Sequence, residues 1–310
     1  MRMERLVLAA VFFVGCGGSS GNKNDGGATP TQDLSVPDLS MNHGNPDLAG
    51  GGKEDGGSSV GEDGGVSPPV AVGPIQTSTS TKLGTFLVDG NGRTLYMFGN
   101  DVPAGASSAA VTNCLTACLA VWPVFHLDTV TVGGTLSAGD FAEFTRSDGA
   151  KQTTYKGWPL YYFQADGAAG AGSTLGQGKL GVWFVVAQPF YNTYVRGDAT
   201  QKNFLTDGAG RSLYNFTNDT RGTSTTPPVS ACTAAACSGP WPAFTLSPTI
   251  APSTLLGTDF TILNWADGTT KQLVYKGWPL YYFAGDTAPG NTSGRGLDAG
   301  AWNTLDPTAP

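Results

Sequence analysis

The sequence has few charged residues and no cluster of basic ones. Only 13 % of its 310 residues are charged, and 24 acidic residues outnumber 17 basic ones, which gives a formal net charge of −7. Affinity for nucleic acid comes largely from clustered Lys and Arg. We therefore expect no nucleic-acid partner.

Histidine is almost as scarce, because the chain contains only His43 and His126. Neither belongs to a CxxCH haem motif or to a His–Cys zinc spacing. A catalytic triad needs a base, usually His, yet His126 has no counterpart in the second of the two repeats described below. Glu143 also lacks a counterpart there. We interpret His126 as a surface residue and expect no catalytic residue.

The apolar run at the N-terminus, residues 6–14, is too short to span a bilayer. Arginines precede it and "VGC" ends it, which predicts a signal peptide over residues 1–15. A small residue before Cys16 resembles the bacterial lipobox, whose cysteine is lipidated, although Phe13 stands where Leu is usual. Lipidation at Cys16 is our prediction, and cleavage by the general signal peptidase is the alternative. Because Gly17 rather than Asp follows, we expect the protein at the outer membrane or cell surface.

Residues favouring long helices are few, whereas the chain contains 45 glycines and 20 prolines. Such a composition is typical of short strands joined by turns. Between residues 16 and 76 the chain is mostly Gly, Asp, Ser, Pro and Asn and has no apolar periodicity. This stretch predicts a disordered linker behind the lipid.

Cysteine is also rare. Apart from Cys16 there are two close pairs, Cys114 with Cys118 and Cys232 with Cys237. An even number of cysteines in an exported chain predicts disulfides. Their CxxxC and CxxxxC spacings differ from the CxxC of thioredoxin-like centres, which makes redox-active thiols the lesser alternative.

The rest of the chain is an internal duplication, with repeat 1 over residues 77–190 and repeat 2 over residues 195–306. "FLVDGNGRTLYMFGND" (86–101) returns as "FLTDGAGRSLYNFTND" (204–219), and "YKGWPLYYF" occurs in both. The Asp-Gly segments predict antiparallel hairpins.

A shorter pattern, Leu-Tyr-x-Phe-x-x-Asp, occurs four times, twice in each repeat. As a strand it would be covered on both faces, since both sets of alternating side chains are apolar or aromatic. Its aspartates follow the strand, where they can cap a turn or, alternatively, bind a structural Ca²⁺. The residues concerned are Tyr96, Tyr161, Tyr214 and Tyr281, with Asp101, Asp166, Asp219 and Asp286.

Four tryptophans precede proline, among them Trp158 and Trp278. Aromatic residues in repeated strands usually fill the core. Exposed on a rim, they would suit recognition of a saccharide or peptide instead.

With its Y-x-[FWY]-x-x-D motif, the Cys pair before Trp-Pro and the "DG…Q…Y.G.PLYYF…D" segment, the chain resembles the bacterial secreted-repeat lipoproteins of unknown function. The resemblance covers roughly residues 77–306. It implies export and carries over no activity.

We expect an all-β fold of two hairpin-rich units, each a sandwich or barrel, or else one joint propeller-like assembly. The expected function is that of a non-catalytic lipoprotein of the cell envelope, a structural or binding module without a cofactor. The lipid would hold it to the membrane, and its partner would be an envelope protein or a saccharide. The alternative is an exported enzyme or redox accessory protein that uses the repeated carboxylates or the Cys pairs.

Overall fold

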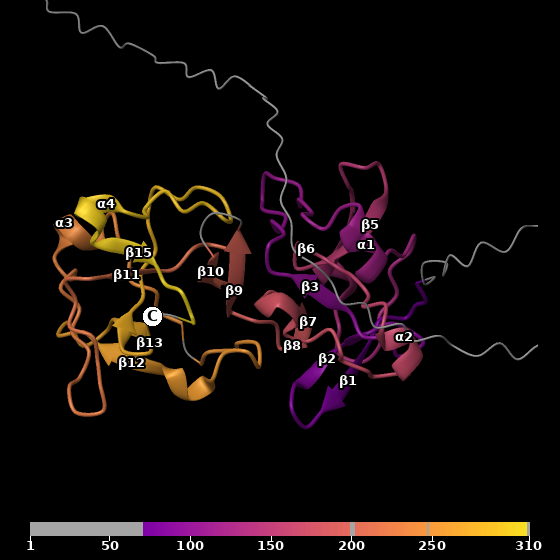
Figure 1. Ribbon diagram of the computed structural model, residues 1–310, viewed down its shortest axis with the longest axis horizontal. Coiled ribbons are helices and arrows are strands. Elements are labelled where there is room, and N and C mark those ends of the chain that lie inside the picture. The colour runs from indigo at the N-terminus through magenta and orange to yellow at the C-terminus, as the bar shows by residue number, and fades with distance from the viewer. Residues whose placement is uncertain (1–70, 199–201, 247, 309–310) are drawn as a thin grey trace, which may run out of the picture. The chain divides into compact units, whose positions relative to one another are not determined.

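The computed structural model describes residues 71–198, 202–246 and 248–308. Short antiparallel strands dominate this part of the chain, so the all-β prediction is confirmed (Figure 1). The predicted signal peptide, Cys16 and most of the predicted linker lie outside the described residues.

Repeat 1 consists of three small sheets. In the first, β2 (Gly84–Val88) lies between β1 (Gln76–Ser80) and β8 (Ala187–Gln188); in the second, β3 (Tyr96–Phe98) pairs with β7 (Trp183–Val185); in the third, β5 (Lys151–Tyr155) lies between β4 (Phe141–Thr145) and β6 (Trp158–Pro159).

Repeat 2 follows the same plan and begins with a strand at Thr193, two residues before the predicted boundary. Among the described residues no sheet closes into a barrel, because each sheet has only two or three strands. The pairs are β9 (Thr193–Asp198) with β10 (Lys202–Asp207), β11 (Tyr214–Phe216) with β15 (Trp302–Thr304), and β13 (Lys271–Tyr275) with both β12 (Phe260–Asn264) and β14 (Trp278–Pro279).

Helices are single turns in loops, as the Gly- and Pro-rich composition requires. None of the described helices has the length and apolar character needed to cross a membrane. The α-helical turns are α1 (Ala117–Val121), α2 (Asp166–Ala169), α3 (Ala235–Ser238) and α4 (Leu297–Gly300), and the 3₁₀ turns are η1 (Ala138–Asp140), η2 (Lys179–Gly181) and η3 (Gly257–Asp259).

The repeated "YKGWP" segment is a two-residue hairpin turn. Lys156 and Gly157 have φ of 49° and 84°, so both central residues are left-handed, as a type I′ turn requires. Tyr155 thereby pairs with Trp158 across β5 and β6. A Cβ on Gly157 would lie 2.7 Å from the carbonyl oxygen of Ala104, so close packing as well as φ requires glycine.

The prediction of antiparallel hairpins at the Asp-Gly segments is only partly correct. The turn after Asp89 forms, and Val88 pairs with Thr94 through a single bridge. Beyond that bridge the arms separate, because β2 joins β1 and β8 whereas β3 joins β7. The second predicted pair of hairpins, β4 with β5 and β12 with β13, is confirmed.

The core is rich in aromatic side chains. Leu160, Tyr161 and Tyr162 are fully buried and Phe163 is 8 % exposed, so side chains on both faces of the "LYYF" segment are covered as expected. Consecutive N–H groups of this segment bond to different neighbours, Leu160 to Thr153 and Tyr161 to Tyr96. Long-range pairing of this kind holds together strands too short to be stable alone.

The two repeats make direct contacts within the compact unit that contains both. Arg196 of repeat 2 donates to the carbonyl oxygens of Asn100 and Asp101, at 3.1 and 2.7 Å. Trp158 of repeat 1 donates its indole N–H to the carbonyl oxygen of Gly208, at 3.0 Å. Both donors are buried, so these contacts fix the repeats to each other.

Candidate functional site

The two Leu-Tyr-x-Phe-x-x-Asp motifs of repeat 1 pair with each other through their tyrosines. The N–H of Tyr96 donates to the carbonyl oxygen of Tyr161, and the N–H of Tyr161 donates to that of Tyr96, both at 2.9 Å. The side chains then cross: the Tyr96 hydroxyl donates to Asp166 at 2.5 Å, and the Tyr161 hydroxyl to Asp101 at 2.7 Å. Each motif thus supplies the acceptor for the tyrosine of the other.

The second oxygen of each carboxylate accepts a backbone N–H from a loop and holds that loop in place. Asp101 accepts the backbone N–H of Asn113 at 2.7 Å, and Asp166 accepts that of Leu175 at 2.9 Å. The predicted role of accepting backbone N–H groups is therefore correct in kind. Its location differs, because the donors come from loops 12 and 9 residues further along the chain.

Repeat 2 reproduces the exchange. Tyr214 donates to Asp286 at 2.6 Å, and Tyr281 donates to Asp219 at 2.8 Å. Both carboxylates again accept one backbone N–H each, from Ser293 and Ala231 at 2.9 and 2.8 Å. The same geometry in two repeats shows that the motif residues serve the fold.

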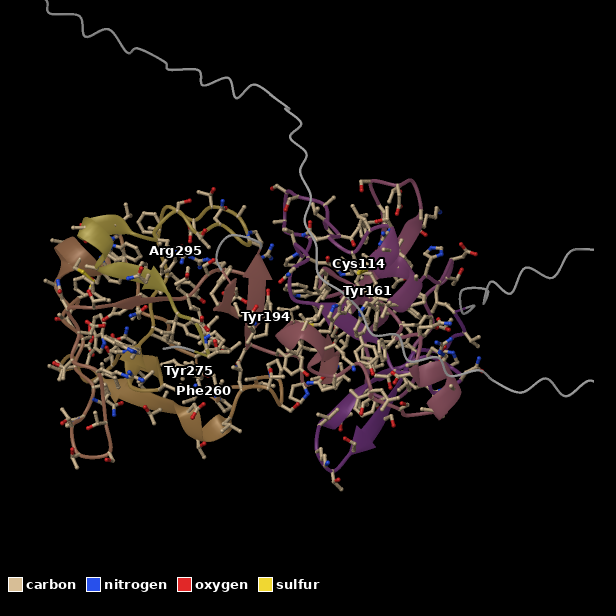
Figure 2. All side chains as sticks on the ribbon, viewed as in Figure 1. Cys114, Tyr161, Tyr194, Phe260, Tyr275 and Arg295 are labelled. Atoms are coloured by element: carbon tan, nitrogen blue, oxygen red, sulfur yellow. A yellow bond between two sulfur atoms is a disulfide. The ribbon has the colours of Figure 1, made fainter. Side chains whose placement is uncertain are left out.

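Tyr161 also contacts a second hydroxyl, that of Thr112, two residues before the buried Cys114. Figure 2 labels Tyr161 and Cys114 among the side chains of repeat 1. In repeat 2, Ser230 takes the place of Thr112, and its hydroxyl lies 2.7 Å from that of Tyr281. Sequence reasoning missed this third member of the network, since nothing in the local pattern links it to the motif.

Burial perturbs the acids and tyrosines of these networks. Loss of solvent raises the pKa of Asp101 to about 7, although the Asn113 N–H and the Tyr161 hydroxyl act in the opposite direction. Burial likewise raises the pKa of Asp219 to about 6. The pKa of Tyr161 is raised well above its ordinary value, first by burial and then by the charge of Asp101.

A cation site at the motif aspartates finds little support in this geometry. One oxygen of each carboxylate accepts a tyrosine O–H and the other a backbone N–H. Calcium instead needs six to eight oxygen ligands that turn their lone pairs toward the ion. Calcium binding stays a prediction that these contacts do not favour.

A second carboxylate–tyrosine pair lies at the first Asp-Gly turn of each repeat, Asp89 with Tyr162 and Asp207 with Tyr282. Asp89 caps the turn by accepting the N–H groups of Asn91 and Arg93 at 2.9 and 2.8 Å. Its other oxygen accepts the hydroxyl of Tyr162 at 2.7 Å. The guanidinium of Arg93 lies 4.4 Å from the centre of the Tyr162 ring. Asp89 and its equivalent Asp207 therefore cap their own turns, which is the role that was predicted for the motif aspartates.

Tryptophans before proline pack into the aromatic core. Trp122 stacks on Trp183 with ring centres 3.7 Å apart, and Trp241 stacks on Trp302 at the same distance. Trp122 and Trp241 are only 4 and 5 % exposed. These two rings therefore belong to the core, as expected for aromatic residues in repeated strands, and they do not form an exposed recognition rim.

Trp158 and Trp278 occupy equivalent positions in different surroundings. Trp158 is fully buried, donates to Gly208 and packs edge-on against Tyr194, with ring centres 4.9 Å apart. Trp278 is partly buried, and within the described residues its buried indole nitrogen has no hydrogen-bond partner. Only the tryptophan of repeat 1 therefore helps to join the repeats.

Both predicted cysteine pairs form disulfides, Cys114 with Cys118 and Cys232 with Cys237. Each bond lies beside a motif pair, because Cys114 and Cys232 follow Thr112 and Ser230 by two residues. The disulfides thus fix the loops that supply the network hydroxyls, and these four cysteines carry no free thiol.

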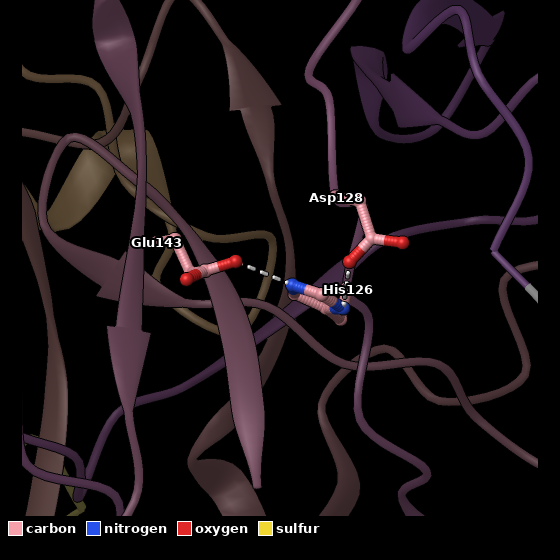
Figure 3. A group of neighbouring side chains, drawn as sticks. All are labelled: His126, Asp128 and Glu143. Carbon is pink, nitrogen blue, oxygen red and sulfur yellow. Dashed lines mark hydrogen bonds and ion pairs between the residues drawn. The ribbon is translucent and has the colours of Figure 1, made fainter.

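His126 is not the isolated residue that the sequence suggested. Its Nε2 lies 2.8 Å from Oε2 of Glu143, and its Nδ1 lies 4.0 Å from Oδ1 of Asp128 (Figure 3). Lys151 approaches the other oxygen of Glu143 at 3.0 Å. Hydrogen bonds from His126 and Lys151 hold the pKa of Glu143 below its usual value. Sequence reasoning treated His126 and Glu143 separately, because nothing in the spacing shows that they meet.

A family model described as a secreted repeat of unknown function matches residues 77–126, 143–187 and 262–306. The first two segments lie in repeat 1 and the third in repeat 2, which confirms the resemblance drawn from the motifs and supports export. Searches of curated proteins and of solved structures found no match.

Proposed function

We propose that this chain, which carries the secreted repeat of unknown function, is a non-catalytic module of the cell envelope. A lipid on Cys16 holds it to the outer membrane or cell surface, and the Gly- and Pro-rich segment before residue 77 serves as a tether. The two repeats form a folded unit that binds an envelope protein or a saccharide.

One observation carries the non-catalytic part of this proposal. In both repeats the recurring carboxylates and tyrosines satisfy one another inside the fold, so the repeated chemistry is already used structurally. Catalysis needs a positioned acid, base or nucleophile that is free to meet a substrate.

The alternative of a redox accessory protein is not favoured, since each disulfide joins cysteines four or five positions apart, unlike the CxxC of thioredoxin-like centres. Cys114 and Cys232 are also fully buried, whereas a reactive cysteine has to be accessible. Among the described residues no observation favours an exported enzyme over a module. Binding faces would then lie where the two repeats differ, because the shared residues are occupied in the fold.

Anchoring is tested with the full chain in a bacterial host that processes lipoproteins. We expect the wild type in the membrane fraction, with a mass increased by the lipid, and the Cys16→Ser variant released from the membrane. A wild-type protein without lipid, or a variant that stays equally membrane-bound, would contradict anchoring. The structural role of the motif has its own test, with which the Discussion closes.

A further inference from the structure

Repeat 1 carries a three-residue cluster that the proposed module function does not use. One ligand atom each from His126, Asp128 and Glu143 can be chosen so that all three lie within 4.8 Å of one another. The imidazole lies between the two carboxylates (Figure 3). The cluster thus combines one nitrogen and two anionic oxygens in a small volume.

Backbone hydrogen bonds fix two of these residues against the same strand. Glu143 on β4 pairs with Thr153 on β5. On the other side of Thr153, its N–H donates to the carbonyl oxygen of Phe125, and its hydroxyl accepts the N–H of Leu127, both at 3.0 Å. Because His126 lies between Phe125 and Leu127, the fold sets its position relative to Glu143.

Repeat 2 keeps this scaffold and lacks the cluster. Ile262 pairs with Leu273, whose N–H donates to Phe244 at 2.7 Å, as Thr153 does to Phe125. At the three cluster positions, His126, Asp128 and Glu143, repeat 2 has Thr245, Ser247 and Ile262. The fold therefore forms without the cluster, and all three of its residues differ together.

We propose that His126, Asp128 and Glu143 form a site for a divalent transition-metal ion of the zinc class. Imidazole and carboxylate suit Zn²⁺, which binds nitrogen and oxygen at about 2.0–2.2 Å and takes water at a remaining position. Three such ligands lie roughly 3–3.5 Å apart, and one ion binds only one imidazole nitrogen, here Nε2 beside Glu143. The Asp128 carboxylate, which now faces Nδ1, therefore swings round toward Nε2 on binding. Its side chain is 93 % exposed and can turn without disturbing the core. Calcium is not expected, because its ligands are oxygens.

Lys151 opposes metal binding. Its Nζ lies 3.0 Å from Oε1 of Glu143, while Oε2 of the same carboxylate faces His126. A positive charge this close to a bound dication is unfavourable even in water. Lys151→Met should therefore tighten metal binding, by roughly threefold to tenfold at an effective dielectric constant near that of water.

The test is calorimetric titration of the purified full chain with Zn²⁺, and with Ca²⁺ in parallel. We expect one Zn²⁺ per chain and no Ca²⁺ at this site. His126→Thr and Glu143→Ile introduce the residues that repeat 2 carries on the same scaffold, so both variants should fold while zinc binding weakens by at least about tenfold. Thermal unfolding of both variants checks the fold.

His43→Ala is the matched control, since His43 is the other histidine of the chain. We expect it to leave zinc binding unchanged. The proposal is overturned by a wild type that binds no zinc, by a folded His126→Thr variant that binds as well as the wild type, or by loss of binding in His43→Ala. Weaker zinc binding by Lys151→Met would also contradict it.

Discussion

The hydroxyl of Tyr161 donates a 2.7 Å hydrogen bond to Asp101, a residue of the other motif and 60 positions earlier in the chain. Tyr96 and Asp166 make the reverse connection across 70 positions. Tyr and Asp thus occur together in one short motif because the Tyr of each motif bonds to the Asp of the other. Each copy contributes one donor and one acceptor, so neither copy can be satisfied alone.

The two equivalent tryptophans should differ in their contribution to stability. Trp158→Phe removes the N–H that bonds to Gly208, whereas Trp278→Phe removes an N–H without a partner in the described residues. We expect Trp158→Phe to lower the free energy of unfolding by about 1–2 kcal/mol more than Trp278→Phe does. Urea unfolding followed by circular dichroism measures both, and equal losses would contradict the role of Trp158 between the repeats.

Stability should depend on pH through the buried acids. The pKa of Asp101 is about 7 in the folded protein against an ordinary 3.8, so the folded state retains a proton that the unfolded state has released. The stability from this group is fully present below a pH of about 4 and is lost as the pH rises through about 7. Asp219 acts in the same direction up to a pH of about 6.

Asp101→Asn, whose side chain cannot ionise, isolates the contribution of Asp101. We expect the fall in unfolding free energy between pH 4 and 8 to be smaller in this variant than in the wild type. Urea midpoints at several pH values give the comparison, and an unchanged slope would show that Asp101 is not the group concerned.

The disulfides should stabilise locally and modestly. Cys114 and Cys118 are four positions apart, and closing so short a loop contributes about 2 kcal/mol in the chain-entropy account. We expect a loss of that order in a Cys114→Ala/Cys118→Ala variant. Thiol titration of the Cys16→Ser chain should find no thiol in the native protein and four after reduction and unfolding. Free native thiols would rule out the disulfides.

Local sequence patterns predicted the turns better than the pairings. "YKGWP" and the Asp-Gly segments form turns because glycine and aspartate satisfy geometry within a few residues. The separation of β2 from β3 could not be predicted, because their partners β8 and β7 come about 100 and about 90 residues later, respectively. Strand pairing over such distances depends on tertiary packing.

The candidate sites were predictable to a similar degree. The motif residues were identified from repetition, and turn capping was assigned to Asp101 although Asp89 makes the turn-capping bonds of that type. Tyr and Asp occur together in all four motifs, and this recurrence was the sequence signal that could have predicted the Tyr–Asp bonds. His126 and Glu143 carried no such signal, since they come together only through bonds on either side of Thr153.

The central claim is that the motif is a structural exchange between Tyr161 and Asp101 and their equivalents. A double-mutant cycle with Tyr161→Phe, Asp101→Asn and the double variant tests it through unfolding free energies at pH 5, where Asp101 keeps its proton in the folded protein. We expect each single variant to lose about 1–3 kcal/mol and the pair to be coupled by about 1–2 kcal/mol. Tyr194→Phe, which removes a buried hydroxyl without a partner in the described residues, should change stability by less than about 0.5 kcal/mol. Additive single losses, or a Tyr161→Phe variant as stable as the wild type, would contradict the account.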